Sequence, residues 1–451
     1  MRETIHHQRP LMQAPVKHFH ADELEAISRI LDSNPEITDL VFNNILRKNV
    51  SSKTGSPGMS ANQVLRALLV KQMNGFSYDE LAFHLADSIT YRRFCNLGAM
   101  DGNPSKSALQ QNISRVTHET LEKINRIILR AAREKDVEKG RKVRIDCTVT
   151  ETNIHPPSDS TLLYDCVRTL ARLLKQAGAI TEISFTNHTR VAKKRMKKII
   201  NTRGKEKRKA PYQQLVRITK QTINYTTPAI NALLRVEPED GIEKWLAAKA
   251  LADELKRYSE LTLKVIKQTE RRIFNDEKVP HTEKVVSIFE PHTNIIKKNN
   301  RDTEFGHKLC ITSGKSSMIL DVTIEDGNPA DSTLAEKMID RQEEIYGQVP
   351  RQAAFDGGFA SKENLANIKD KGVSDVMFHK KCGLKISDMA KSGWVYKRLK
   401  NFRAGVEGVI SFVKRCFGLS RCTWKGLTHF KQYVWGSVIS MNLLTMARQL
   451  L

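Results

Sequence analysis

Arg403–Lys414, RAGVEGVISFVK, places a single acid between two cations at the spacing of an α-helix. At about 100° per residue, such a helix carries an apolar stripe and holds Arg403, Glu407 and Lys414 together on its flank. The stripe consists of Phe402, Val406, Val409, Ile410 and Val413. Glu407 is the only acid between Met389 and Leu451, a region rich in lysine and arginine. Two interpretations are open: a surface Arg403–Glu407 ion pair, worth about 0.2–0.5 kcal/mol, or a site that needs a carboxylate among cations.

The overall charge indicates a polyanionic partner. The chain has 451 residues, with 74 Lys and Arg against 50 Asp and Glu, and a net charge of +24. Such an excess is typical of proteins that bind nucleic acid, and an anionic membrane surface is the second candidate. There is no apolar run of about 18 residues and the N-terminus, MRETIHHQRP, is polar, so an intracellular protein is expected. The seven cysteines form no Cys-x-x-Cys pair, which argues against a disulfide framework or a zinc site.

The N-terminal third has the pattern of short helices. Residues 1–55 are expected to form an arm with one helix, ADELEAISRILDSN. Residues 56–140 follow with three more, SANQVLRALLVKQMNG, SYDELAFHLAD and SITYRRFCNL, and Ser77 and Glu80 have the spacing of a capping box. This composition predicts a helix-turn-helix-like DNA-binding domain in which Arg92 and Arg93 contact the DNA backbone. A plain helical bundle without a DNA role is the alternative.

An acid in the middle of an apolar strand is the next unusual feature. Val143–Val149, within KVRIDCTVT, alternates apolar and polar residues as a strand does, and Asp146 lies inside it. Aspartate is depleted in strands. A carboxylate is tolerated there when a cation compensates its charge, and a bound metal ion is one such cation.

Residues 161–280 read as helix throughout and contain the most basic segment of the chain. That segment, TRVAKKRMKKIINTRGKEKRKA, has a single acid, Glu206. We predict that it contacts DNA phosphates, although a charge run is also typical of a solvated helix face. The predicted contact residues are Lys193, Lys194, Arg195, Lys197 and Lys198.

Strand patterns return after residue 284. KVVSIFEP, GHKLCITSG and SMILDVTIEDGN read as strands, the segment DSTLAEKMIDRQEEIYG reads as a helix, and the next strand, RQAAFDGG, ends on Asp356 before two glycines. Open α/β sheets place their sites in loops at the carboxyl ends of strands, although Asp-Gly-Gly is also a common turn. A short strand, VMFHK, then leads to the helix of Glu407.

With the helical segment set aside, the strand of Asp146 is followed by two or more strands, a helix, the strand that ends at Asp356, another strand and the helix of Glu407. This order is that of the RNase H-like fold. The chain resembles the DDE transposases of bacterial insertion sequences. RIDCTVT, AAFDGGFAS and NFRAGVEGVISFVKR stand where that family has its first Asp, its second Asp and its Glu. Arg403, Glu407 and Lys414 also fit the R-x3-E-x6-K part of a family signature, whereas Lys400 stands where the signature has a tyrosine.

The resemblance implies an α/β protein with an all-α helix-turn-helix-like N-terminal domain before its catalytic core. It implies an RNase H-like mixed-sheet core made of residues 141–160 and 281–430, interrupted by a basic helical insertion, 161–280, and followed by a C-terminal helix, 431–451. Asp146, Asp356 and Glu407 would be the catalytic residues and the ligands of two Mg²⁺ ions, for which Mn²⁺ can substitute. Arg403, Lys414 and Arg415 would contact DNA.

The implied reaction has two steps. Water cuts an element end to leave a 3′-OH, and that hydroxyl then attacks target DNA. The implied partners are double-stranded DNA, as element ends and as target, and a second copy of the chain in a homodimer or larger assembly. The bacterial cytoplasm, on the nucleoid, is the implied location.

Several alternatives stay open. Asp321 is the main competitor as a sheet acid, while Asp331 has the spacing of a helix N-cap and reads as structural. The competing functions are a domesticated sequence-specific DNA-binding protein, an RNase H-like nuclease without strand transfer, and a structural or RNA-binding basic protein.

Overall fold

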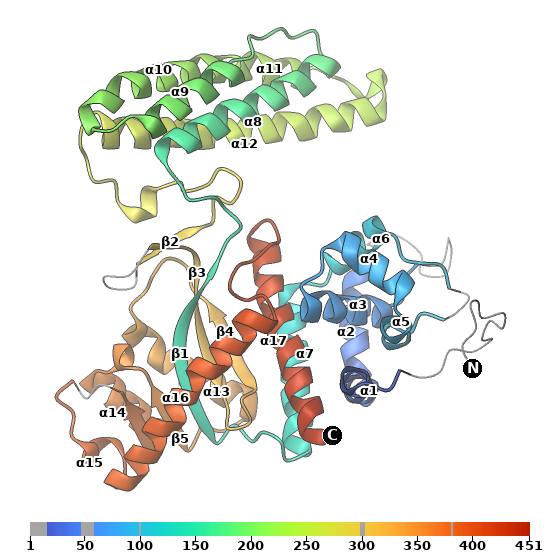
Figure 1. Ribbon diagram of the computed structural model, residues 1–451, viewed down its shortest axis with the longest axis vertical. Helices are drawn as coiled ribbons and strands as arrows, with labels where there is room; N and C mark the ends of the chain where they lie inside the picture. The colour runs from blue at the N-terminus through green and yellow to red at the C-terminus, as the bar shows by residue number, and fades with distance from the viewer. Residues whose placement is uncertain (1–15, 47–57, 99–100, 298–302, 380–381) are drawn as a thin grey trace, which may run out of the picture.

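A single mixed sheet organises the computed structural model, which describes residues 16–46, 58–98, 101–297, 303–379 and 382–451. The strand order is β2-β3-β1-β5-β6, and β4 also pairs with β3. The bounds are β1 Lys142–Glu151, β2 Asn294–Lys297, β3 Thr303–Ser313, β4 Ile319–Ile324, β5 Gln352–Phe355 and β6 Asp375–Phe378. β1 is antiparallel to β3 and parallel to β5, and β5 is parallel to β6. The sheet therefore changes from antiparallel to parallel at β1, the strand that carries Asp146 (Figure 1).

Helices pack against the sheet and bury its parallel strands. β5 and β6 have the sequences QAAF and DVMF and are almost wholly buried, as parallel strands covered on both faces require. Helix α16, Gly393–Cys416, lies against β1, β5 and β6. Helices α13, Ala335–Tyr346, and α14, Lys362–Asp370, pack against β4 and β6 respectively, while the four-residue helix α15, Ile386–Met389, precedes α16.

The N-terminal helices form a layer beside the sheet. They are α1 Phe19–Asp32, α2 Glu36–Ile45, α3 Ala61–Asn74, α4 Tyr78–Asp87, α5 Ile89–Phe94, α6 Lys106–Ile113 and α7 His118–Glu134. The predicted capping box of Ser77 and Glu80 at the start of α4 is confirmed. Helix α2 was not predicted, because its sequence, EITDLVFNNI, is short and follows Pro35 without a capping side chain. Residues 1–15 and 47–55 of the expected N-terminal arm and helix lie outside the described residues.

Helix α17, Leu427–Leu450, joins these helices to the sheet. It contacts α1, α3, α7 and β4, and it is buried on nearly all sides (Figure 1). The amide of Asn442 bonds both backbone groups of Ile319 and the side chain of Asn125. Gln72 bonds the carbonyl of Phe417. The buried apolar residues of the N-terminal helices, the sheet and α17 consequently form one continuous cluster.

A helical bundle stands apart from this body at the end of the sheet that holds β2 (Figure 1). It consists of α8 Asp159–Ile180, α9 Thr189–Asn201, α10 Lys205–Asn224, α11 Thr226–Leu234 and α12 Ile242–Ile273. These helices bury a second apolar cluster of their own. The expected helical character of residues 161–280 is thus confirmed at the level of secondary structure.

One predicted strand is wrong. KVVSIFEP, residues 284–291, is not a strand, although Val285, Val286 and Ile288 are buried. The side chain of Gln268 in α12 bonds both the N–H and the C=O of Val285. Because a side chain satisfies these backbone groups, the segment needs no neighbouring strand. The seven cysteines are all unpaired, and none of the helices within the described ranges is long and apolar enough to cross a membrane.

Candidate active site

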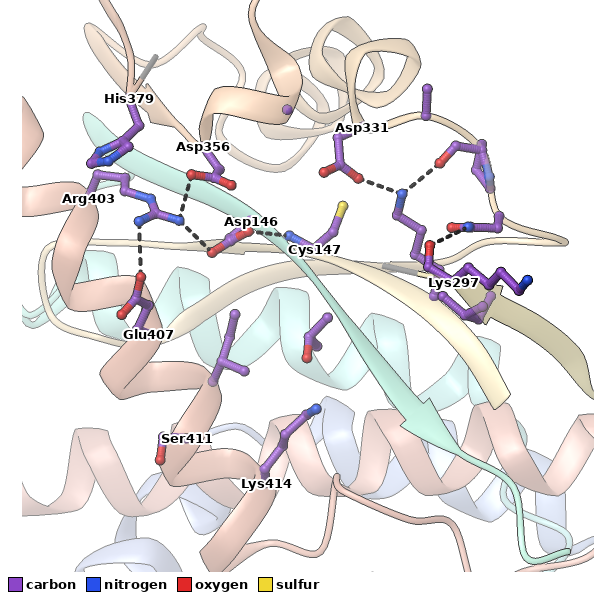
Figure 2. Close-up of a pocket in the computed structure, with 18 of the residues that line it drawn as sticks. Asp146, Cys147, Lys297, Asp331, Asp356, His379, Arg403, Glu407, Ser411 and Lys414 are labelled. Carbon is purple, nitrogen blue, oxygen red and sulfur yellow. Dashed lines mark hydrogen bonds and ion pairs between the residues drawn. The ribbon is translucent and has the colours of Figure 1, made fainter. Parts of the chain in front are cut away.

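Three carboxylates predicted from the sequence come together from three elements. Asp146 lies in the middle of β1, Asp356 directly follows β5, and Glu407 lies on α16. β1 and β5 are parallel neighbours, and Ile145 lies opposite Phe355. The residues that follow them, Asp146 and Asp356, therefore lie side by side. Helix α16 contacts both strands, and its Glu407 lies across Arg403 from Asp356 (Figure 2).

The guanidinium of Arg403 binds all three carboxylates. Its Nη2 lies 3.1 Å from Oδ2 of Asp146 and 2.9 Å from Oδ1 of Asp356, and its Nη1 lies 3.0 Å from Oε1 of Glu407 (Figure 2). The side chain of Arg403 is only 10% exposed. Arg403 is therefore an ion-pair partner of Glu407 as well as of the two aspartates, and its predicted role as a DNA contact stays a prediction. Two converging aspartates need a buried cation, and Arg403 supplies it.

The electrostatics of the three acids differ with their depth. The side chains of Asp146, Asp356 and Glu407 are 14%, 37% and 70% exposed. Burial raises the pKa of Asp146 to about 6, the negative charge of Asp356 adds to the rise, and Arg403 opposes it. Asp146 is the carboxylate that depends most on a neighbouring cation, because water screens it least.

The carboxylates line an open pocket of about 960 Å³ with cationic walls. The cations of its lining, besides Arg403, are Lys297, Lys308, Lys414 and Arg415. Lys414 and Arg415 follow Glu407 on α16, and Lys297 ends β2 (Figure 2). A pocket lined by both carboxylates and cations suits a phosphodiester backbone held next to a reactive centre.

The pocket contains a second ion pair that the sequence did not reveal. Nζ of Lys308 lies 2.5 Å from Oδ1 of Asp331 and donates to the carbonyl of Pro329 at 2.6 Å. The prediction that Asp331 is a helix N-cap is wrong. The N-cap of that helical turn is Ala330, and Asp331 is the first residue of the turn. Its charge also acts on Asp146. A lysine within the apolar strand GHKLCITSG was the signal that could have marked Lys308.

Asp321 does not belong to this pocket. It is 1% exposed and accepts two hydrogen bonds from the guanidinium of Arg341 on α13, from Nε at 2.5 Å and from Nη2 at 2.8 Å. The competing sheet acid is therefore a buried ion pair that ties β4 to α13.

Arg144 fixes α16 to β1 next to the carboxylates. It is 6% exposed and donates to Oγ of Ser313 at 3.0 Å, to the carbonyl of Phe402 at 3.1 Å and to Oγ of Ser317 at 3.1 Å. Its guanidinium also lies over the Phe402 ring. Arg144 and Asp146 alternate with Ile145 on β1, so they point to the same face of the sheet. Because Phe402 precedes Arg403, this contact positions the helix turn that reaches the acids.

The other predicted DNA contacts lie outside the pocket. Arg92 donates to the carbonyls of Leu85, Gly98 and Asp101 and thereby holds the loop after α5. Arg93 is exposed. On α9, Lys193, Lys194, Lys197 and Lys198 are exposed and Arg195 is half-buried. Their DNA-binding roles stay predictions.

The donor set fits a divalent metal ion in its chemistry. Carboxylate oxygens are the ligands that Mg²⁺ prefers, and here two of them contact one nitrogen of a single cation. In the described part of the chain, however, no group of three or more His, Cys, Asp or Glu residues is arranged as a metal cluster. Arg403 occupies the space between the acids, so a metal ion has to displace it.

Two family models match the chain. The model described as "Transposase DDE domain" matches residues 276–443, which include Asp356 and Glu407 but not Asp146. The model described as "Transposase domain (DUF772)" matches residues 15–115, the N-terminal helices. The chain is a DDE-type transposase. Enzymes of this type cut DNA and transfer strands, and they generally use divalent metal ions. Neither a curated protein nor a solved structure matches this transposase.

Proposed function

We propose that this transposase cuts the ends of its own element to release a 3′-OH and joins that hydroxyl to target DNA by direct transesterification. The observation that carries the proposal is the convergence of Asp146, Asp356 and Glu407 on Arg403 in a pocket with cationic walls. In the proposed assignment these three acids are the catalytic residues.

The topology supports an RNase H-like core. β3 and β4 are antiparallel, β1 is antiparallel to β3, and β5 and β6 run parallel to β1. This arrangement of five strands is the one that the RNase H-like resemblance implies, and it brings Asp146 and Asp356 to adjacent strands. The helical bundle connects β1 to β2, and we interpret it as an insertion into that core. The N-terminal helices are proposed to be a helix-turn-helix-like domain that binds element ends.

The two steps balance without a covalent enzyme intermediate. Hydrolysis adds water across one P–O3′ bond and leaves a 3′-OH and a 5′-phosphate. In the joining step, the 3′-OH forms a new P–O bond with a target phosphate as the target's own P–O3′ bond breaks. The second step conserves the number of phosphodiester bonds, so it needs no energy source.

The residues of the pocket have separate roles in this proposal. Asp146 would hold two Mg²⁺ or Mn²⁺ ions, and Asp356 and Glu407 would each hold one. Such ions supply an activated nucleophile and neutralise the leaving oxygen. Arg403 keeps the acids together before DNA arrives and then becomes free to hold a phosphate. Lys414 and Arg415 on the same helix orient the backbone next to the acids. The proposed location is the bacterial cytoplasm, on the nucleoid, where the DNA substrate lies.

Glu407→Gln tests the proposal. The substrate is duplex DNA with the sequence that flanks the coding region, either intact or precut to a 3′-OH, together with a plasmid target and Mg²⁺. We expect cleavage and joining to fall by about a thousandfold, because a metal ligand acts on transition-state charge. DNA affinity should stay unchanged or rise slightly. Glu343→Gln, an exposed acid on α13 outside the pocket, is the matched control.

The outcomes separate the alternatives. A Glu407→Gln variant that still cuts contradicts the site assignment. Cutting by the wild-type protein without joining of the precut end identifies a nuclease, and binding without either reaction identifies a domesticated DNA-binding protein.

A further inference from the structure

The outward face of helix α10 differs in chemistry from the rest of the basic bundle. Tyr212, Leu215, Val216 and Thr219 of α10 are buried against the other helices. The opposite face is exposed and consists of Ala210, Gln213, Gln214, Arg217, Lys220, Gln221 and Asn224. No acid follows Glu206 in this helix. The exposed face therefore presents four amides, one guanidinium and one lysine, whereas lysines dominate the neighbouring helix α9.

These side chains have the hydrogen-bonding groups that read DNA bases. Arginine pairs with the O6 and N7 of guanine, and glutamine or asparagine pairs with the N6 and N7 of adenine, all in the major groove. Gln213, Arg217 and Gln221 are four residues apart and so lie along one stripe of the helix. From Ala210 to Asn224 the stripe is about 21 Å long at 1.5 Å per residue. The major groove, about 12 Å wide, admits an α-helix.

The surroundings of α10 have the charge that a DNA helix requires. α9 packs beside α10 and against α8, contains no acid, and exposes Lys193, Lys194, Lys197 and Lys198. The exposed face of α10 itself lines a groove of about 770 Å³, together with Glu270 of α12 and Phe274, which follows α12. Nζ of Lys220 lies 2.7 Å from Oε1 of Glu270, which offsets that acid. The face is thus polar along its centre and cationic beside it.

We propose that α10 is a recognition helix, which enters the major groove at an element end and reads bases with Gln213, Arg217 and Gln221. The lysines of α9 hold the adjacent phosphates. This inference rests on the proposed function for its partner, double-stranded DNA. It assigns sequence recognition to the helical bundle, whereas a purely phosphate-contacting bundle would bind all sequences alike.

The test selects duplexes from a random-sequence library with the full-length wild-type protein. Affinities for an enriched duplex and for a scrambled duplex are then measured over a range of salt concentrations. Arg217→Lys keeps the charge but loses the paired donors, so we expect the preference for the enriched duplex to fall by about tenfold. Gln213→Ala with Gln221→Ala should lower it at least as much. Affinity for the scrambled duplex should change by less than about twofold in both variants.

Lys194→Ala with Lys197→Ala on α9 is the matched control. It should weaken binding of both duplexes alike and reduce the slope of log K against log salt by about 1.8, because two phosphate contacts are lost. Circular dichroism checks that each variant keeps its helix content.

Each result decides something. Unchanged preference in both α10 variants overturns the recognition helix, as does a wild-type selection that enriches no sequence. If the wild-type protein cuts and joins DNA while either of these results is obtained, the recognition role of α10 is wrong but the proposed function stands. A wild-type protein that binds no duplex overturns the proposed function as well.

Discussion

Replacing Arg403 with glutamine removes the guanidinium that binds Asp146, Asp356 and Glu407. Leaving a buried carboxylate without its partner costs about 3–5 kcal/mol of the free energy of unfolding, and this range is an upper bound for Asp146, whose side chain is 14% exposed. The more exposed Asp356 and Glu407 are screened by water and add little. Asp146 has a pKa of about 6 even beside Arg403, so it can avoid part of the penalty by binding a proton. We expect a net loss of about 2–3 kcal/mol at neutral pH without metal.

The assay is hydrogen exchange resolved on peptides from β1 and α16, with unfolding by urea as the global measure. Peptide resolution matters because the helical bundle has its own apolar cluster and can unfold separately. Adding Asp146→Asn to Arg403→Gln should restore part of the lost stability, since the uncompensated charge disappears. Millimolar Mg²⁺ should narrow the gap between Arg403→Gln and wild type, because the ion can take the place of the guanidinium.

Two results would refute this reasoning. One is an Arg403→Gln variant within about 0.5 kcal/mol of the wild type in EDTA, which would make the contacts no stronger than surface ion pairs. The other is an Asp146→Asn substitution that costs the same stability with and without Arg403, which would show that the two side chains are not coupled.

Two further predictions concern residues away from the acids. A Cβ at position 405 would overlap Nη1 of Arg144, whereas one at Gly408 would meet nothing within 4 Å. We therefore expect Gly405→Ala to lower the free energy of unfolding, measured in urea, by about 1–3 kcal/mol, and Gly408→Ala to raise it by up to about 1 kcal/mol. Equal effects of the two substitutions would contradict the close packing of Arg144 against α16. Burial beside His292 lowers the pKa of His307 to about 4, so the folded state binds its proton less readily than the unfolded state does. We expect His307 to lower the free energy of unfolding by about 3 kcal/mol as pH drops from about 6.5 to 4. In His307→Gln the decrease over this pH range should be smaller by that amount. If the free energy of unfolding of the wild type and of the variant changes equally with pH, His307 is not the cause.

The sequence predicted the positions of the acids because each one broke a local rule. An aspartate in an apolar strand, an aspartate before two glycines and a glutamate alone among cations all need compensation. The structure brings Asp146, Asp356 and Glu407 together, although their catalytic role stays a prediction. The element order of the sheet was also predictable, because β1 alternates apolar and polar residues and the segments of β4, β5 and β6 are short and largely apolar.

The remainder depended on contacts between distant parts of the chain. Periodicity places Arg403 on the flank of its helix, but only the packing of α16 over β1 and β5 makes it a buried partner of three acids. Lys308 and Asp331 are 23 positions apart, and nothing local predicts their pairing. KVVSIFEP has the composition of a strand, and the bonds from Gln268 that replace a neighbouring strand cannot be read from the segment itself.

The burial of α17 has a consequence for synthesis of the protein. α3 leaves the ribosome about 350 residues before α17 does, yet it needs α17 to cover its apolar face. At about 5–20 residues per second, that face waits roughly 20–70 s for its partner. During this interval the nascent N-terminal helices are a surface on which a chaperone can bind or a second nascent chain can aggregate. A chain that stops before Leu427 lacks this cover, so we expect it to expose the apolar face of α3 and to aggregate.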